Sequence, residues 1–178
     1  MFILLRAEME IVLASKKQRF AVELLTNSAD SEASRGKLAH LRRLRHLDLS
    51  GTSVSSLTLS HGLDCADLRT LAVSDCRGGL VSDQGLVEAA RRHRRISELR
   101  LAASCVTDLG LVSTASSLPR LRHLDLRRCA GVSSSCLAPL AQLSPGLQTL
   151  LVRGCPAVTP DMVKCVSPNF YSLKKIDL

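Results

Sequence analysis

The side chains best suited to chemistry recur in one repeated context. His46 and Asp48 lie in the segment Arg-His-Leu-Asp-Leu, and His123 and Asp125 lie in the same five residues three repeats later. A histidine beside a carboxylate can act as a general base or bind a metal ion. The two histidines are too far apart to share one ion, and each aspartate can simply pair with its neighbouring histidine. Because repetition explains the identity without chemistry, we predict neither a catalytic nor a metal site.

Arginines form the second set of candidates. Arg100, Arg127 and Arg153 occupy related positions in successive repeats, close to the acidic Glu98 and Asp125. We expect the three guanidinium groups to converge. Arginine binds carboxylates bidentately, so the cluster could dock acidic side chains or a carboxyl terminus. The open alternative is a solvated face whose charges pair with one another, because exposed ion pairs contribute little.

An internal repeat must position these residues. Its apolar core, L-x-x-L-x-L, starts at Leu44, Leu68, Ile96, Leu121, Leu147 and Leu173, at spacings of 24, 28, 25, 26 and 26 residues. No unit of this length buries its own apolar face, so the units must stack. The alternating core predicts a short strand. A following Val-Ser or Val-Thr pair predicts a helix N-cap, and Pro160 suits the first position of the last helix. The expected caps are Ser55, Ser82, Thr107, Ser133 and Thr159.

The predicted fold is therefore an α/β solenoid of about five to six repeats over residues 38–178, with a parallel sheet on its concave face and helices on its convex face. Side chains between the leucines face the concave side in columns, with neighbours about 4.8 Å apart. The first column is His46, Thr70, Glu98, His123, Thr149 and Lys175; the second is Asp48, Ala72, Arg100, Asp125, Leu151 and Asp177; the third is Ser50, Ser74, Ala102, Arg127 and Arg153. The predicted partner-binding residues are His46, Asp48, Glu98, Arg100, His123, Asp125, Arg127 and Arg153.

The repeat resembles the cysteine-containing leucine-rich repeat of F-box/LRR proteins. That subtype continues its core with x-x-C and then a hydrophobic residue with Thr/Ser-Asp-x-Gly-Leu. Cys76, Cys129 and Cys155 fall on the cysteine position, and Val81–Leu86 and Val106–Leu111 match the second half. The resemblance implies substrate recognition for a Skp–cullin–F-box ubiquitin ligase, with ligase subunits among the partners. No F-box is visible, because its Leu-Pro opening and its tryptophan are absent.

The cysteines predict structure more than reactivity. Thr52, Cys76, Ser104, Cys129 and Cys155 form an expected ladder of small buried side chains, each bonding a neighbouring backbone carbonyl through S–H or O–H. No C-x-x-C pair exists, so we expect no zinc, and no cofactor is expected. The run Arg91–Arg95 predicts a solvated helix end, with a phosphate-contacting or localisation patch as the alternative.

The two ends of the chain differ from the repeats. Residues 1–37 predict either a helical cap or a degenerate repeat with Ile11-Val12-Leu13 as its strand. The chain stops directly after a strand core, which predicts a solenoid open at its C-terminus. Seven cysteines, no basic leader and no apolar run of 18 residues predict the cytoplasm or nucleus and no membrane contact.

Net charge and aromatic content bear on whether the chain binds protein or nucleic acid. The chain carries a net charge of +8 but only four aromatic residues, too few to stack single-stranded bases. The leading hypothesis is a non-enzymatic module that binds a protein, acidic at its contact surface, on the concave face. The alternative is a basic scaffold or adaptor for RNA or another polyanion, although no nucleic-acid-binding motif accompanies the charge.

Overall fold

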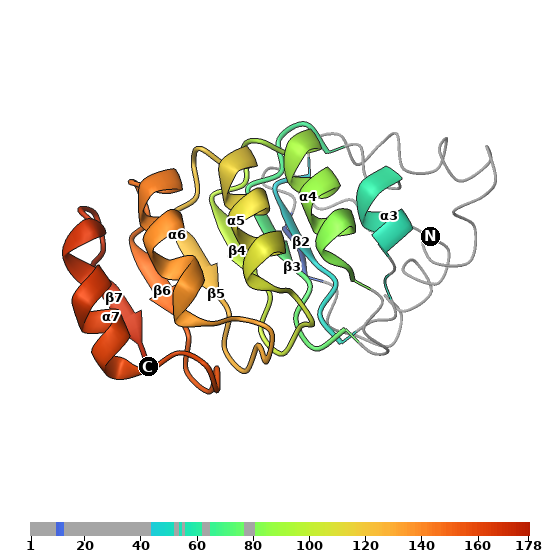
Figure 1. Cartoon of the computed structure of the whole chain (residues 1–178). Helices are drawn as coiled ribbons and strands as arrows, with labels where there is room; N and C mark the ends of the chain where they lie inside the picture. The colour runs from blue at the N-terminus through green and yellow to red at the C-terminus, as the bar shows by residue number, and fades with distance from the viewer. Residues whose placement is uncertain (1–9, 13–43, 52–53, 55, 62–64, 77–80) are drawn as a thin grey trace, which may run out of the picture.

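Strands and helices alternate along the chain (Figure 1). In the computed structural model the described residues are 10–12, 44–51, 54, 56–61, 65–76 and 81–178. The strands are β1 (Glu10–Val12), β2 (His46–Asp48), β3 (Thr70–Ala72), β4 (Glu98–Arg100), β5 (His123–Asp125), β6 (Thr149–Leu151) and β7 (Lys175–Asp177). The α-helices are α3 (Ser56–His61), α4 (Asp83–Arg92), α5 (Asp108–Ser117), α6 (Leu137–Leu143) and α7 (Pro160–Val166). Two 3-10 turns, η3 (Ser134–Cys136) and η4 (Ser167–Asn169), precede α6 and follow α7.

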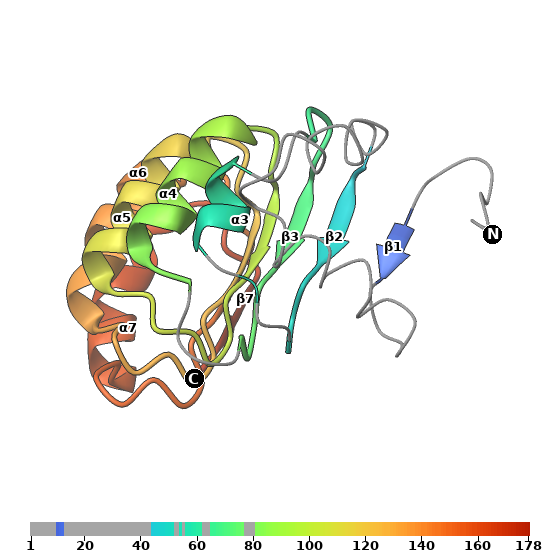
Figure 2. The ribbon, with the colours of Figure 1, turned by 90° about the vertical axis from the view of Figure 1, so that its right-hand side faces the viewer.

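The strands form one parallel sheet in chain order, β1 to β7. Its register aligns the central leucine of each core, so that Leu71 lies opposite Leu99 and Leu99 opposite Leu124. The helices cover one face of this sheet (Figure 2), and in the described part of the chain no element covers the other face. The predicted α/β solenoid of stacked repeats is confirmed. We call the uncovered face the open face.

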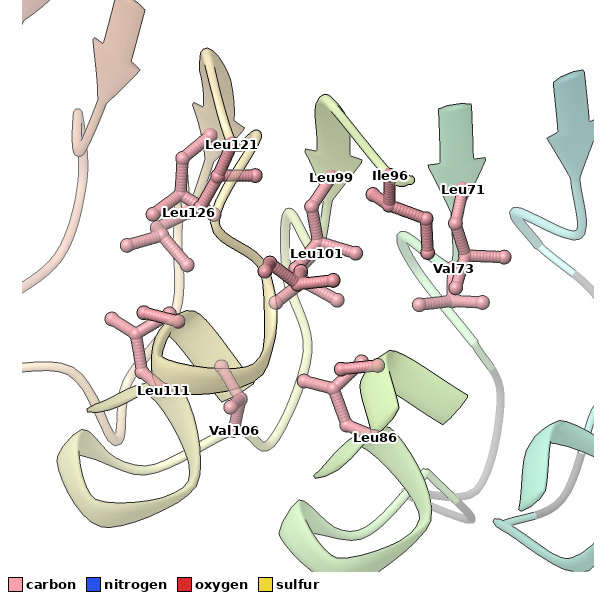
Figure 3. Close-up of a cluster of buried hydrophobic side chains, with 14 of the residues drawn as sticks. Leu71, Val73, Leu86, Ile96, Leu99, Leu101, Val106, Leu111, Leu121 and Leu126 are labelled. Atoms are coloured by element: carbon pink, nitrogen blue, oxygen red, sulfur yellow. The ribbon is translucent and has the colours of Figure 1, made fainter. Parts of the chain in front are cut away.

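The hydrophobic core lies between the sheet and the helices. Leu99 and Leu101 point from β4 and the residue after it toward the helical layer (Figure 3). Leu86 of α4 and Leu111 of α5 belong to the same buried cluster. Each of these leucines is at most 1% exposed. Burying one leucine contributes about 1.5–3 kcal/mol, so each repeat is held chiefly by this apolar contact with its neighbours.

Side-chain caps form at three of the predicted positions, Ser82, Thr107 and Ser133. Ser82 and Thr107 precede α4 and α5 in extended conformation, and their hydroxyls accept from the amides of Gly85 and Gly110. Ser133 caps a 3-10 turn rather than an α-helix. Pro160 is the first residue of α7, as expected, and Ser55 lies outside the described residues.

The caps also join one repeat to the next. Asp83 of α4 accepts hydrogen bonds from the amide of Thr107, at 3.0 Å, and from its hydroxyl, at 2.5 Å. Asp108 of α5 makes the same two contacts with the amide and hydroxyl of Ser133. The aspartate of the Ser/Thr-Asp-x-Gly-Leu pattern therefore couples adjacent helix starts.

Among the described residues, β1 and β7 are the outermost strands of the sheet. β1 pairs in parallel with β2, with Ile11 opposite Leu47. This strand lies where the degenerate-repeat alternative for residues 1–37 places one; Leu13 and the rest of that segment lie outside the described residues.

Candidate functional site

The open face carries the predicted columns in register. His46 lies opposite Thr70 and Glu98 lies opposite His123, so the first column runs straight across the strands. Arg100 lies opposite Asp125 in the second column. The parallel register therefore turns residues about 25 positions apart in sequence into direct neighbours.

A polar row crosses β2, β3 and β4. His46 Nδ1 lies 2.9 Å from Thr70 Oγ1, which donates to Glu98 Oε2 at 3.3 Å. Since the one proton of Thr70 points to Glu98, the hydroxyl oxygen accepts from His46 Nδ1. An activated nucleophile would have to donate its proton to the imidazole, which is the opposite order. The row orients His46 and Glu98 without making Thr70 a nucleophile.

Each aspartate beside a histidine bonds within its own repeat. The Asp125 carboxylate accepts hydrogen bonds from Nε and Nη2 of Arg127, at 2.9 and 2.7 Å, and from the Arg127 amide, at 3.1 Å. Asp48 accepts the amide of Ser50 at 2.9 Å. The pairing of each aspartate with its neighbouring histidine is therefore wrong, because groups two residues further along reach the carboxylate first.

The pKa of the Asp125 carboxyl lies below its ordinary value. Burial acts to raise this pKa, but the hydrogen bonds and charge of Arg127, together with the charge of Arg100, outweigh burial. The same contact raises the pKa of Arg127. The pair is therefore fixed in its charged form on the open face.

The three predicted arginines do not gather at one point. Arg100 is held by Glu98, with Nε 2.7 Å and Nη2 2.5 Å from Oε1. Arg127 and Arg153 instead line a shallow hollow of about 340 Å³ together with Arg128, Ala102 and Gly154. The hollow lies at the carboxyl-terminal edge of the sheet, where the chain leaves β4, β5 and β6. We call it the open-face hollow.

The arginines around this hollow differ in whether a carboxylate pairs with them. Arg127 is paired with Asp125, and Arg128 lies 3.4 Å from an exposed Asp75 carboxylate. Within the described ranges no carboxylate lies within 4.0 Å of Arg153. Sequence reasoning missed Arg128, which follows the third column with a left-handed φ of 59°; the turn position shared with Asp75 and Ala103 is the signal that could have found it.

The cysteine ladder is formed by sulfur donors. Cys129 Sγ donates to the Leu101 carbonyl at 3.1 Å, and Cys155 Sγ donates to the Leu126 carbonyl at 3.0 Å. Cys76 Sγ contacts the Val73 and Leu49 carbonyls at 3.2 and 3.7 Å.

Ser104 departs from the expected ladder bond. Its Oγ lies 3.6 Å from Cys129 Sγ, in the following repeat, instead of on a carbonyl of the preceding one. Thr52 lies outside the described residues.

The buried thiols are poor nucleophiles. Burial, the nearby charge of Asp108 and a hydrogen bond with that carboxylate raise the pKa of Cys136 to about 12. Burial likewise raises the pKa of Cys155. A thiol reacts as its thiolate, so neither is set up for catalysis. Among the residues that the structure describes, no three His, Cys, Asp or Glu side chains form a group that could hold a metal ion.

The Arg91–Arg95 run is solvated except at its centre. Arg91 pairs with Glu88 at 2.8 Å, and Arg95 pairs with Asp67 at 2.5 Å. His93, however, is buried as the C-cap of α4, with Nδ1 3.0 Å from the Cys65 carbonyl. The expectation of a solvated helix end holds for the arginines and is wrong for His93. None of the described helices is long and apolar enough to span a bilayer.

Fold and register together define the class: a leucine-rich-repeat solenoid with an open, charged sheet face. No protein-family model matches the chain. Similar solved structures include a tropomodulin C-terminal domain from Caenorhabditis elegans, with 12% identity and a TM-score of 0.55 over 79% of this chain and 91% of that one. The actin-binding site 2 of leiomodin-1 aligns with 13% identity and a TM-score of 0.50 over 88% of each chain. At such identities the likeness shows the fold.

The assignment to F-box/LRR proteins is wrong. The similar structures named above are a tropomodulin domain and a leiomodin domain, and no family model supports the F-box subtype. The resemblance misled because the leucine spacing and the cysteine position follow from the geometry of a single stacked repeat. The leucines fill the core, and the Cys129 sulfur satisfies the carbonyl where the strand turns away. Such features specify a solenoid and carry no information about a family.

Proposed function

We propose that this chain is a non-enzymatic protein-recognition module that binds an acidic segment of a partner protein at the open-face hollow. The observation that carries the proposal is Arg153, which lines the hollow and has no carboxylate within 4.0 Å among the described residues. Arg127, fixed by Asp125, provides a second and already oriented guanidinium. A carboxylate that enters the hollow can pair bidentately with Arg153.

Other features of the open face support binding over catalysis. The row from His46 to Glu98 is ordered by hydrogen bonds, so little side-chain freedom is lost when a partner covers it. A solenoid presents an extended surface of this kind to a partner. The ubiquitin-ligase role loses its basis with the F-box resemblance and is no part of the proposal. We place the module in the cytoplasm or nucleus.

Binding of a fluorescein-labelled oligoglutamate, followed by fluorescence anisotropy, tests the proposal. We expect Arg153→Glu to weaken binding about tenfold, the loss of one charge-assisted bidentate contact. The matched control is Arg92→Glu, an equal charge reversal at an exposed position of α4. Purified actin is the first protein to test, because the leiomodin-1 domain of similar fold is named an actin-binding site.

Three outcomes contradict the proposal. Oligoglutamate does not bind, or it binds Arg153→Glu and Arg92→Glu equally, in which case net charge and not the hollow is responsible. The third is that oligouridine RNA binds more tightly than oligoglutamate and with a steeper salt dependence, which identifies a polyanion scaffold.

A further inference from the structure

A second basic hollow lies at the opposite edge of the sheet, where the chain enters β3, β4 and β5. It measures about 450 Å³ and is lined by Arg69, Arg95, Ser97, Pro119, Arg120, Leu121, Arg122 and Gly146. Parallel strands place all their amino ends at one edge, so this hollow is separate from the open-face hollow at the carboxyl edge. We call it the amino-edge hollow.

Backbone hydrogen bonds fix the spacing of its charges. The Ser97 amide donates to the Arg69 carbonyl, and the Arg122 amide donates to the Ser97 carbonyl, both at 2.8 Å. Arg69 and Arg122 are therefore two rungs apart, about 10 Å at the backbone. Arginine side chains can close that gap around a small anion, while Ser97 leaves the space between them unfilled.

The amino-edge hollow holds an excess of positive charge. Of its four arginines, Arg95 is paired with Asp67. Arg69, Arg120 and Arg122 have no carboxylate within 4.0 Å in the part of the chain that the structure describes. Like charges held around one recess repel each other, so an anion that enters it removes an unfavourable interaction as well as forming new ones.

We propose that the amino-edge hollow binds a phosphorylated serine or threonine side chain of a partner protein. A phosphomonoester carries a charge of about −1.5 to −2 and three acceptor oxygens, which matches several free guanidiniums better than one carboxylate does. A nucleic-acid backbone offers one charge per phosphate and needs a longer basic track. The column runs Arg45, Arg69, Ser97, Arg122, Gln148 and Lys174. Uncharged Ser97 and Gln148 divide its basic residues into separate short segments, so they form no continuous track.

The test compares peptides that differ only in charge. The probe is a fluorescein-labelled peptide of glycine, alanine and one phosphoserine. Two comparison peptides carry serine or glutamate at the phosphoserine position, and oligouridine RNA is a fourth ligand. We expect the phosphopeptide to bind about tenfold more tightly than the glutamate peptide, and Arg120→Gln/Arg122→Gln to remove that preference. Arg92→Gln/Arg94→Gln loses the same charge at exposed positions outside both hollows and should retain it.

The outcomes separate this site from the open-face function. Oligoglutamate binding that is unchanged in Arg120→Gln/Arg122→Gln shows that the variant is folded and that the two hollows act independently. Equal binding of the phosphorylated and glutamate peptides overturns the phosphate site. Tighter binding of RNA than of phosphopeptide, lost in the same variant, overturns it in favour of nucleic acid. Binding of inorganic phosphate without the phosphopeptide overturns a protein partner.

Discussion

Gly110→Ala tests how closely neighbouring helices approach. Gly110 lies in the first turn of α5, and a Cβ there would lie 2.5 Å from the Asp83 Cβ and closer still to its carboxyl group. The Asp83 carboxyl group must then rotate away and give up its two hydrogen bonds to Thr107. The two helix starts must also move apart, because rotation does not move the Asp83 Cβ. We expect the substitution to destabilise the protein, against the general rule that alanine is favoured over glycine in a helix.

The size of the effect follows from these contacts. Two hydrogen bonds to an exposed carboxylate, at the low end of about 1.5–3 kcal/mol each, cost about 3 kcal/mol. Replacing a helical glycine by alanine returns about 1 kcal/mol. The expected net loss is about 2 kcal/mol, which lowers Tm by about 4–8 °C in a domain of this size.

Thermal and urea unfolding followed by circular dichroism measure this loss. Gly146→Ala is the control, because its Cβ would meet only the Leu121 carbonyl oxygen, at 4.0 Å, and should change stability by less than about 0.5 kcal/mol. A Tm for Gly110→Ala equal to or above that of the parent protein would refute the close approach of α4 and α5.

Three further predictions concern the core and the charged pair. Leu124→Ala removes a side chain that is 1% exposed and should cost about 3 kcal/mol in urea unfolding, whereas Leu109→Ala, at a position 77% exposed, should cost almost nothing; similar losses would contradict the core. Cys105 is exposed and should be alkylated in the native protein at neutral pH, whereas Cys136, with its pKa near 12, should react only after denaturation. Peptide mapping by mass spectrometry measures the order of reaction. Alkylation of Cys136 before Cys105 would contradict the prediction. The folded-state pKa of Asp125 lies below 3.8, so the Asp125–Arg127 pair stabilises the fold fully above that pH and loses this effect as the pH falls toward the folded-state pKa. Arg127→Gln should reduce the slope of the free energy of unfolding against pH in this acidic range. An unchanged slope would argue against the pair.

The repeat could be predicted from sequence because its signal is periodic. Leucines at Leu121, Leu124 and Leu126 have the spacing of a strand with one buried side, and Thr107 has the residue type of a cap. Stacking then follows from the need to bury apolar faces, and the columns of the open face follow from the stacking. The same reasoning could not identify a family, since these residues serve the rung itself.

The pairing of charged side chains could not be predicted, because register alone does not show which acceptor a guanidinium reaches. Arg100 turns to Glu98 in its own strand, although Asp125 lies directly opposite it. All five residues of the Arg91–Arg95 run are basic in sequence and give no sign that one of them is buried. His93 is buried because the end of α4 directs its side chain toward the Cys65 carbonyl.

The sequence by itself determined the period, the strands, the caps and the order of the open-face columns, because each depends on local residue type and spacing. Only the tertiary structure decided where positive charge remains unpaired. Arg153 and Arg122 resemble every other arginine in the sequence. They differ because Asp125 pairs with Arg127 inside its own repeat, stacking places Asp67 beside Arg95, and these two are left without a described carboxylate. Coulombic pairing acts over a few ångströms, within one repeat or between two, and such distances exist only once the chain has folded.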